Sequence, residues 1–210
     1  AGSKCAETIC HVDFFATAAE VAQRPLAAGE TAPDSFSLVP LFAGKTWDRA
    51  PVIHHSASGM FAIRFSALHP ARVMAVAAGS PGGWPIVPLA EKDGQSLTYP
   101  AGVADLEELT GRPFDIDAYR RVSQLIVMGG LDDNDGLDHG DGWDEAHAAV
   151  VDALFGDAPI ARWPHAQAAY ESIGADAEFL LVDGVGHDRR ALQEHSTRFL
   201  EGVLQAGRDR

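Results

Sequence analysis

The sequence predicts an α/β fold in which a mostly parallel sheet is flanked by helices. From about residue 50 to the C-terminus, short apolar runs alternate with segments whose apolar residues recur at helical spacing. This alternation is typical of parallel sheets, because two parallel strands are usually joined by a helical crossover. Segments that follow three predicted strands carry Ser56, an aspartate cluster starting at Asp132, and His187. Loops at the carboxyl ends of parallel strands commonly form sites, so we expect function there.

Composition and charge narrow the function classes further. The chain has 210 residues, 46% of them hydrophobic and 22% charged, which fits one globular domain and excludes a disordered chain. A net charge of −14 repels phosphate backbones, so nucleic-acid binding is not expected as the main function. No apolar run reaches the roughly 18 residues of a membrane span. No secretory signal is visible, which favours the cytoplasm without fixing the compartment.

The first segments with a clear strand or helix pattern lie between residues 51 and 78. Residues 51–54 are apolar and stop at a cluster of small residues, as a short buried strand does. Residues 59–69 are rich in apolar side chains and stop before Pro70, which predicts a helix. A second apolar run at 72–78 indicates the next strand.

Two stretches have a less regular pattern. Residues 1–48 contain two apolar runs separated by turn formers and predict no clear alternation. The segment 80–114 is punctuated by glycine and proline and is too long for a passive connection. Within a single domain spanning 1–210, we therefore expect residues 80–122 to be an insertion or cap-like segment.

The C-terminal half returns to regular alternation. Residues 123–128 form an apolar run that ends at two glycines, which indicates a third strand. Helices are expected at 143–155 and 164–173, and a fourth strand at 178–182. The apolar stripe within 189–205 predicts a final helix.

The strongest local motif is His54-His55-Ser56-Ala57-Ser58-Gly59, between a predicted strand and a predicted helix. A nucleophile on such a turn is held in a strained backbone with its oxygen exposed. Small residues are needed two positions before and after it, where strand and helix nearly touch. Ser58 meets the second requirement, whereas His54 does not meet the first. Ser58 is also the better candidate for the helix N-cap by position, which leaves Ser56 free for chemistry.

An acid and a histidine follow the later strands. Asp132 comes three residues after the strand-terminating Gly129, a position suited to orienting a histidine, and Asp135 on the same loop is the fallback. His187 follows the last strand after a Gly-Val-Gly turn. The chain order serine, acid, histidine is that of α/β-hydrolases rather than of chymotrypsin-like or subtilisin-like enzymes.

From about residue 50 onward the chain resembles the α/β-hydrolase superfamily, in particular its bacterial esterase and polyhydroxybutyrate-depolymerase-like branch. The motifs that carry the resemblance are 56–61, 78–84, 129–135 and 186–187. It implies a serine hydrolase that cleaves carboxylic esters, small or polymeric, through an acyl-enzyme and without a cofactor. It further implies Ser56 as nucleophile, His187 as general base and Asp132 as the residue that orients it, with the Ala57 N–H as half of the oxyanion hole.

The chain departs from this family in its first 50 residues. They are shorter than the family's early strands and contain no His-Gly oxyanion motif, so N-terminal strands are absent or divergent. Local candidates for the second oxyanion donor are the backbone near Phe14-Phe15 or Leu41-Phe42. Since an oxyanion hole needs two donors, we predict a formed triad with weak or absent turnover, and a sheet with fewer strands than that of a full-length relative. A non-catalytic or truncated member of the fold is the rival interpretation.

Some side chains have two interpretations. His55, Trp84 and Tyr99 either pack the fold or line a substrate pocket. The acidic loop 132–145 suggests a divalent-metal module as an alternative function. Its carboxylates do not fit the register of a calcium loop, however, and His139 and His147 are too far apart for a compact ligand pair. A solvated acidic loop without metal is therefore the preferred interpretation.

Overall fold

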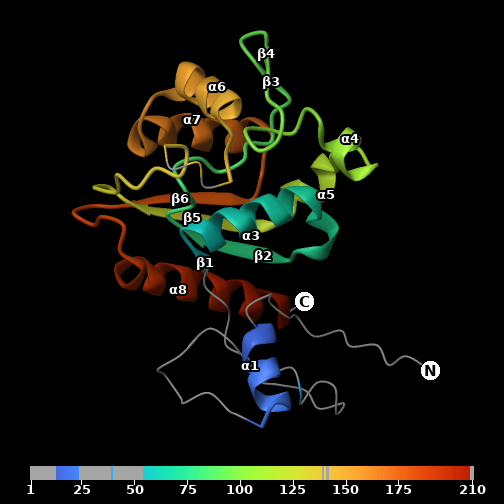
Figure 1. Ribbon diagram of the computed structural model, residues 1–210, viewed down its shortest axis with the longest axis vertical. Coiled ribbons are helices and arrows are strands. Elements are labelled where there is room, and N and C mark those ends of the chain that lie inside the picture. The colour runs from blue at the N-terminus through green and yellow to red at the C-terminus, as the bar shows by residue number, and fades with distance from the viewer. Residues whose placement is uncertain (1–12, 24–38, 40–53, 139, 141, 209–210) are drawn as a thin grey trace. The chain divides into compact units, whose positions relative to one another are not determined.

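The computed structural model describes residues 13–23, 39, 54–138, 140 and 142–208 (Figure 1). The chain divides into two units, Ala1–Val52 and Ile53–Arg210. Helix α1 (Asp13–Val21) is the element described in the first unit. In the second unit, a parallel sheet and its helices follow the predicted strand–helix order (Figure 1).

A four-stranded parallel sheet organises the second unit, with strand order β1-β2-β5-β6. Its strands are β1 (His54–His55), β2 (Ala75–Gly79), β5 (Ser123–Gly129) and β6 (Ala177–Val182). His55 pairs with Gly79, Gly79 with Val127, and Val127 with Leu180. Because all four strands run in the same direction, their carboxyl ends meet at one edge, and the loops that carry the predicted site residues leave from that edge. The predicted α/β fold is confirmed.

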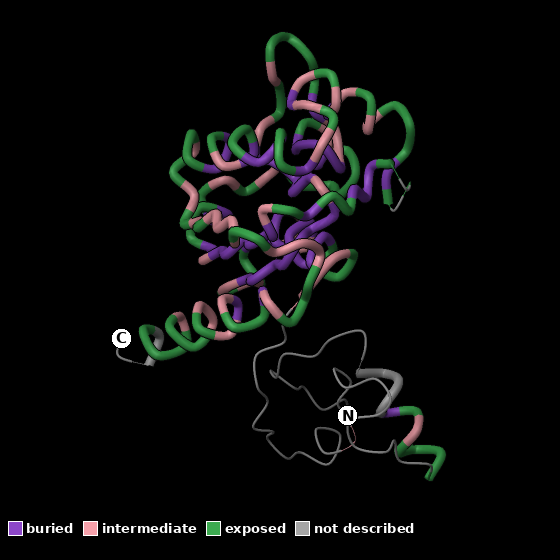
Figure 2. Tube along the Cα trace, turned by 90° about the vertical axis from the view of Figure 1, so that its left-hand side faces the viewer, coloured by how far each residue is buried: buried purple, intermediate pink, exposed green. Residues whose placement is uncertain are grey.

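Alternating side chains along β5 serve two different cores. Ile126 and Met128 belong to a large apolar cluster that also takes in α3 (Ala57–Leu68), α6 (Glu145–Phe155) and α7 (Pro159–Ser172). Leu125 and Val127 point the other way and pack with Leu192 of α8 (Arg189–Arg208). This is the period of two expected of a sheet buried on both faces. Buried positions concentrate around the strands between these helix layers (Figure 2).

Residues 80–122 pack into the same large core. They contain the short antiparallel pair β3 (Glu91–Lys92) and β4 (Gln95–Ser96) and the short helices α4 (Leu106–Thr110) and α5 (Ile116–Arg120). The large side chains of this segment that are buried in the main apolar cluster include Trp84, Ile86, Val87, Leu97, Leu106 and Tyr119. The segment therefore supplies a large share of the apolar cluster that covers one face of the sheet.

Element boundaries differ from prediction where proline or a tight turn decides them. The helix predicted at 164–173 begins at Pro159, which occupies the first helical turn, and Pro164 lies inside it. Proline fits the first turn because its missing N–H would have no intrahelical acceptor there. The strand predicted at 72–78 begins at Ala75, because Pro70–Arg72 form a 3-10 turn. Residues 51–53 of the first predicted strand lie outside the described residues. In the described part of the chain, no helix is long and apolar enough to cross a membrane.

Candidate active site

Ser56 occupies the turn between β1 and α3, in a backbone conformation that is rare for a residue with a side chain. Its φ is 56° and its ψ is −129°. The conformation is held on both sides, since the Ser56 N–H donates to Gly79 O at 2.8 Å and the Met60 N–H donates to Ser56 O at 2.9 Å. Strain of this kind, over-determined by the surrounding structure, is typical of functional turns.

The hydroxyls of Ser56 and Ser58 have different roles. Helix α3 begins at Ala57, so Ser56 and not Ser58 holds the N-cap position, which corrects the sequence-based assignment. The Ser56 side chain nevertheless makes no capping hydrogen bond. The Ser58 hydroxyl donates to His55 O at 2.9 Å and accepts from the His55 N–H at 3.1 Å. Ser58 therefore fastens the turn, and Ser56 Oγ is left without a structural task at the helix terminus.

Close backbone approach fixes where this turn lies. A Cβ on Gly59 would come within 3.0 Å of Gly79 O, so the start of α3 lies directly against the end of β2. His54, the bulky residue before the turn, is half-buried and pairs with Ala78 in the sheet. The strand accommodates the histidine that departs from the family pattern.

Asp132 and His187 contact one another across the same edge of the sheet. His187 Nδ1 lies 3.1 Å from each carboxylate oxygen of Asp132. A carboxylate only accepts, so Nδ1 carries the proton and Nε2 is the ring atom left for a reacting group. The Asp132 side chain is 2% exposed and that of His187 24% exposed, so the acid is buried behind a partly accessible ring. Asp132 Oδ1 also accepts the Asn134 N–H at 3.1 Å.

Backbone contacts hold the acid loop and the histidine loop together. The Leu131 N–H donates to Val185 O at 2.8 Å, and the Gly130 N–H donates to Val182 O at 2.9 Å. Gly129 lies so close to the other loop that a Cβ there would be 2.2 Å from Val185 O. The Asp132–His187 contact thus rests on a fixed main-chain approach as well as on the two side chains.

His55 brings the Ser56 turn next to His187. The ring centroids of His55 and His187 are 4.6 Å apart. The His55 Nδ1 is buried and has no hydrogen-bond partner among the described residues. Burial lowers the pKa of His55, and the neighbouring His187 lowers this pKa further. His55 therefore packs as a neutral ring between the turn and the histidine loop.

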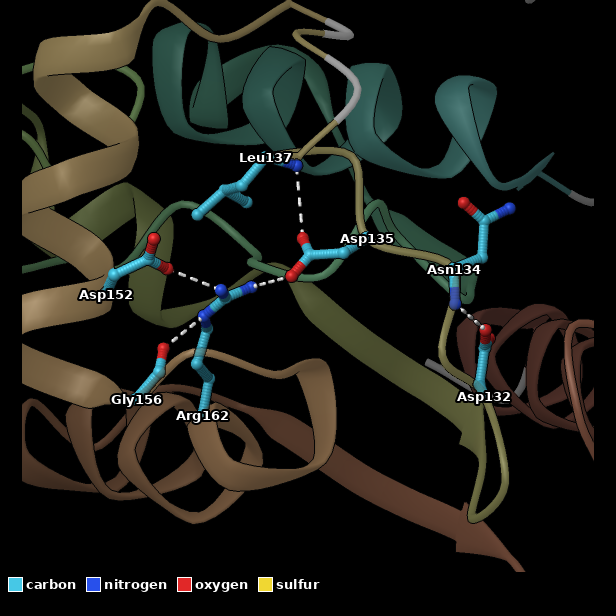
Figure 3. A network of polar contacts seen from close by, with 7 residues as sticks. All are labelled: Asp132, Asn134, Asp135, Leu137, Asp152, Gly156 and Arg162. Carbon is cyan, nitrogen blue, oxygen red and sulfur yellow. Dashed lines mark hydrogen bonds and ion pairs between the residues drawn. The ribbon is translucent and has the colours of Figure 1, made fainter.

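Asp135, the fallback acid, is engaged elsewhere. Its Oδ2 lies 2.6 Å from Arg162 Nη1, and its Oδ1 accepts the Leu137 N–H at 3.0 Å. Figure 3 shows Asp132 and Asp135 leaving the same loop in different directions. The structure brings Asp132, and not Asp135, to His187.

The two aromatic pocket candidates lie in different surroundings. Trp84 has no exposed surface, donates its Nε1–H to Ala101 O at 3.0 Å, and stacks on Phe155. A side chain without accessible surface packs the core, which favours the packing interpretation of Trp84 over the pocket interpretation. Tyr99 is half-buried, and its ring lies 5.8 Å from the guanidinium carbon of Arg64.

A second hydroxyl–histidine–acid arrangement was missed by sequence reasoning. Thr98 Oγ1 lies 2.9 Å from His147 Nε2, and His147 Nδ1 lies 2.7 Å from Asp144 Oδ2. Asp144 is the N-cap of α6, and hydrogen bonds from the His147 backbone and side chain lower its pKa. We interpret the set as a link between residues 80–122 and α6, because Thr98 does not lie on a strained strand–helix turn. The separation of Thr98 from His147 in sequence left no local signal for it.

The described carboxylates of the acidic loop are not gathered into a metal site. Among the residues that the structure describes, no group of three or more His, Cys, Asp or Glu side chains is placed to hold a metal ion. Three of its carboxylates have other partners: Asp132 contacts His187, Asp135 contacts Arg162, and Asp144 contacts His147. His139 and Asp141 lie outside the described residues.

The oxyanion candidates are only partly described. Ala57 is the first residue of α3, where a backbone N–H has no acceptor within the helix. Phe14 and Phe15 lie in the first turn of α1, in the other unit of the chain. Leu41 and Phe42 lie outside the described residues.

Comparisons with known proteins bear on the fold. No protein-family model and no curated protein matches the sequence. Among solved structures, poly(aspartic acid) hydrolase-1 from Sphingomonas sp. KT-1 is similar with a TM-score of 0.50 and 20% identity, covering 76% of this chain and 58% of that one. The poly(3-hydroxybutyrate) depolymerase LpqC from Bordetella parapertussis is similar with a TM-score of 0.47 and 26% identity, covering 70% of this chain and 47% of that one.

This chain therefore spans about half of the length of these neighbours, both of which are of the α/β-hydrolase type. The chain has the mostly parallel, helix-flanked fold of the α/β hydrolases.

Proposed function

We propose that this protein is a serine hydrolase that cleaves carboxylic esters through Ser56, His187 and Asp132. The observation that carries the proposal is the buried Asp132 carboxylate on His187 Nδ1, at the sheet edge where Ser56 occupies a strained turn. The His55–His187 ring contact adds support, because His55 directly precedes Ser56. Residue types, chain order and local geometry agree with a nucleophile, a base and an orienting acid.

The proposed reaction proceeds in two halves. Ser56 Oγ attacks the ester carbonyl carbon while His187 Nε2 takes the hydroxyl proton, and Asp132 holds the ring and stabilises the imidazolium. The Ala57 N–H donates to the oxygen that becomes negatively charged. The tetrahedral intermediate collapses, and the departing alkoxide takes the proton from His187, leaving an acyl group on Ser56. Water, deprotonated by His187, then releases the acid and restores the serine.

Serine variants of the same turn test the proposal. Hydrolysis of p-nitrophenyl acetate and butyrate is measured for the wild type, Ser56→Ala and Ser58→Ala. We expect Ser56→Ala to fall to the uncatalysed rate. Ser58→Ala should stay within about tenfold of the wild type, because it loses hydrogen bonds of modest net strength. Equal rates for Ser56→Ala and the wild type would exclude Ser56 as nucleophile, and no hydrolysis by any of the three would favour the non-catalytic alternative.

A further inference from the structure

Arg162 is a buried cation whose three hydrogen-bond partners come from two parts of the fold. Its side chain is 1% exposed. Nη1 donates to Asp135 Oδ2 at 2.6 Å, Nη2 to Asp152 Oδ1 at 2.5 Å, and Nε to Gly156 O at 2.7 Å (Figure 3). The planar fork of a guanidinium suits such a set of fixed acceptors, whereas a lysine ammonium could not span them.

The three partners tie one loop to two helices. Asp152 lies in α6, Gly156 is the residue that ends α6, and Arg162 itself lies in α7. Asp135 belongs to the loop that carries Asp132, three residues earlier. Arg162 is therefore a bridge from the helical layer to the loop that presents the acid to His187.

Asp135 is held from several sides, so its carboxylate has little freedom to move. Its Oδ1 accepts the Leu137 N–H, and a Cβ placed on Gly83 would be 2.4 Å from the same oxygen. Gly136 also lies close to the segment that follows β2, since a Cβ there would be 2.9 Å from Gly82 O. The loop downstream of Asp132 is thus clamped between Arg162 and the segment that follows β2.

We propose that Arg162 is a positioning residue, which acts through Asp135 to fix residues 132–137 so that the Asp132 carboxylate faces His187. The inference deepens the proposed hydrolase function and rests on it for the kinetic readout. Neither Arg162 nor Asp135 contacts a reacting atom in this role. The expected consequence of loosening the bridge is an Asp132 that pairs with His187 in only part of the molecules.

Asp135→Asn and Asp152→Asn form a matched pair of test variants. Both carboxylates bind Arg162 at similar distances, but only Asp135 lies on the loop that carries Asp132. The Asp152 side chain is 39% exposed, so water can replace part of what its neutralisation removes. A role in stability alone would make the two variants similar in catalysis, whereas positioning through the loop separates them.

Two readouts are measured on each folded variant. The first is the split between kcat and KM for p-nitrophenyl butyrate. We expect Asp135→Asn to lower kcat about 10- to 100-fold with little change in KM, because a misplaced base affects the chemical step more than binding. Asp152→Asn should remain close to the wild type in both constants.

The second readout is the proton NMR resonance of the His187 Nδ1–H, which a bond to the Asp132 carboxylate moves downfield and protects from exchange with water. We expect this resonance in the wild type and in Asp152→Asn, and its broadening or upfield movement in Asp135→Asn. The measurement needs no turnover, so it separates failure of this inference from failure of the proposed hydrolase function. Assignment is made with a His187→Gln control.

Should Asp135→Asn not fold, Arg162→Lys replaces it. This variant keeps the buried positive charge beside both aspartates but cannot span the three acceptors. We expect a reduced kcat and a broadened His187 resonance. A folded Asp135→Asn or Arg162→Lys protein with wild-type kcat and a wild-type resonance would overturn the inference, as would equal kinetic losses in Asp135→Asn and Asp152→Asn.

Discussion

Ser56 has a strained backbone and a proposed role as nucleophile. Substitution by glycine and by alanine distinguishes the effect of the strain from the effect of losing the hydroxyl. At φ 56° and ψ −129° a side chain is disfavoured, whereas glycine is not. Ser56→Gly should therefore unfold at a higher temperature than Ser56→Ala, by the equivalent of about 1 kcal/mol, and both should lack ester hydrolysis. Thermal unfolding by circular dichroism measures the difference. Glycine and alanine variants of equal stability would mean that the turn stores no strain.

His55 makes stability depend on pH in a predictable direction. Its pKa in the folded protein is lowered from 6.5, chiefly by burial and then by the charge of His187. The unfolded chain therefore binds a proton at a higher pH than the folded chain does. The stability linked to neutral His55 is present above about pH 6.5 and is lost as the pH falls through the unfolded value towards the folded one. Between about pH 7.5 and pH 5, the Tm of His55→Gln should thus fall by less than the Tm of the wild type. A parallel loss in both proteins would contradict this.

At the scale of elements, the contact between two loops decides whether Asp132 meets His187. A Cβ on Gly129 would be 2.2 Å from Val185 O and 2.4 Å from Gly186 O, both backbone atoms that cannot turn away. Gly129→Ala should therefore push the loops apart and destabilise the fold by about 1–3 kcal/mol, with a loss of hydrolysis.

Gly130→Ala is the matched control for that change. The nearest atom to a Cβ on Gly130 is Val182 O at 3.5 Å, an ordinary van der Waals distance. Both variants are compared by urea unfolding and by p-nitrophenyl ester hydrolysis. If Gly129→Ala behaves like Gly130→Ala, the close approach of the loops is not what holds the site.

Helices and strands were predicted well where their own residues carry the pattern, and less well where distant contacts set their boundaries. Strands β5 and β6 and the last helix were predicted within a few residues, because apolar periodicity records burial directly. The start of α7 was missed because Pro164 was interpreted as a helix start, although its lost hydrogen bond is tolerated inside the helix. The N-cap at Ser56 was missed because the turn is set by hydrogen bonds to Gly79 on another strand.

Across the whole molecule, the sequence predicted the candidate site residues but not the residues that support them. Ser56, Asp132 and His187 stand at strand ends, so a parallel sheet brings their loops to one edge by topology alone. Arg162 and Asp135 lie in different elements, and their pairing depends on how α7 packs over the acid loop. No periodicity or motif records that packing. The assignment of catalytic roles stays a prediction that the experiments decide.

The rate of turnover depends on how many donors form the oxyanion hole, and we expect this rate to be low. Ala57 is the one donor that the strand–helix turn offers, and loss of one oxyanion donor typically costs about 100- to 1,000-fold in kcat. Since the median kcat of enzymes is about 10 s⁻¹, we expect a value of about 0.01–0.1 s⁻¹ on p-nitrophenyl butyrate. Steady-state kinetics at saturating substrate measure it. A kcat in the ordinary range would contradict the prediction and point to a second donor.

Covalent labelling with a fluorophosphonate, followed by intact-mass measurement and peptide mapping, tests directly whether Ser56 is the nucleophile. An activated serine attacks the phosphorus and releases fluoride, so labelling requires the nucleophile and its base but not efficient turnover. We predict one added phosphonyl group per chain, located on Ser56, with no labelling of Ser56→Ala or His187→Gln and retained labelling of Ser58→Ala. A label on Ser58, Thr98 or any residue other than Ser56, or a folded protein that takes up none, would contradict it.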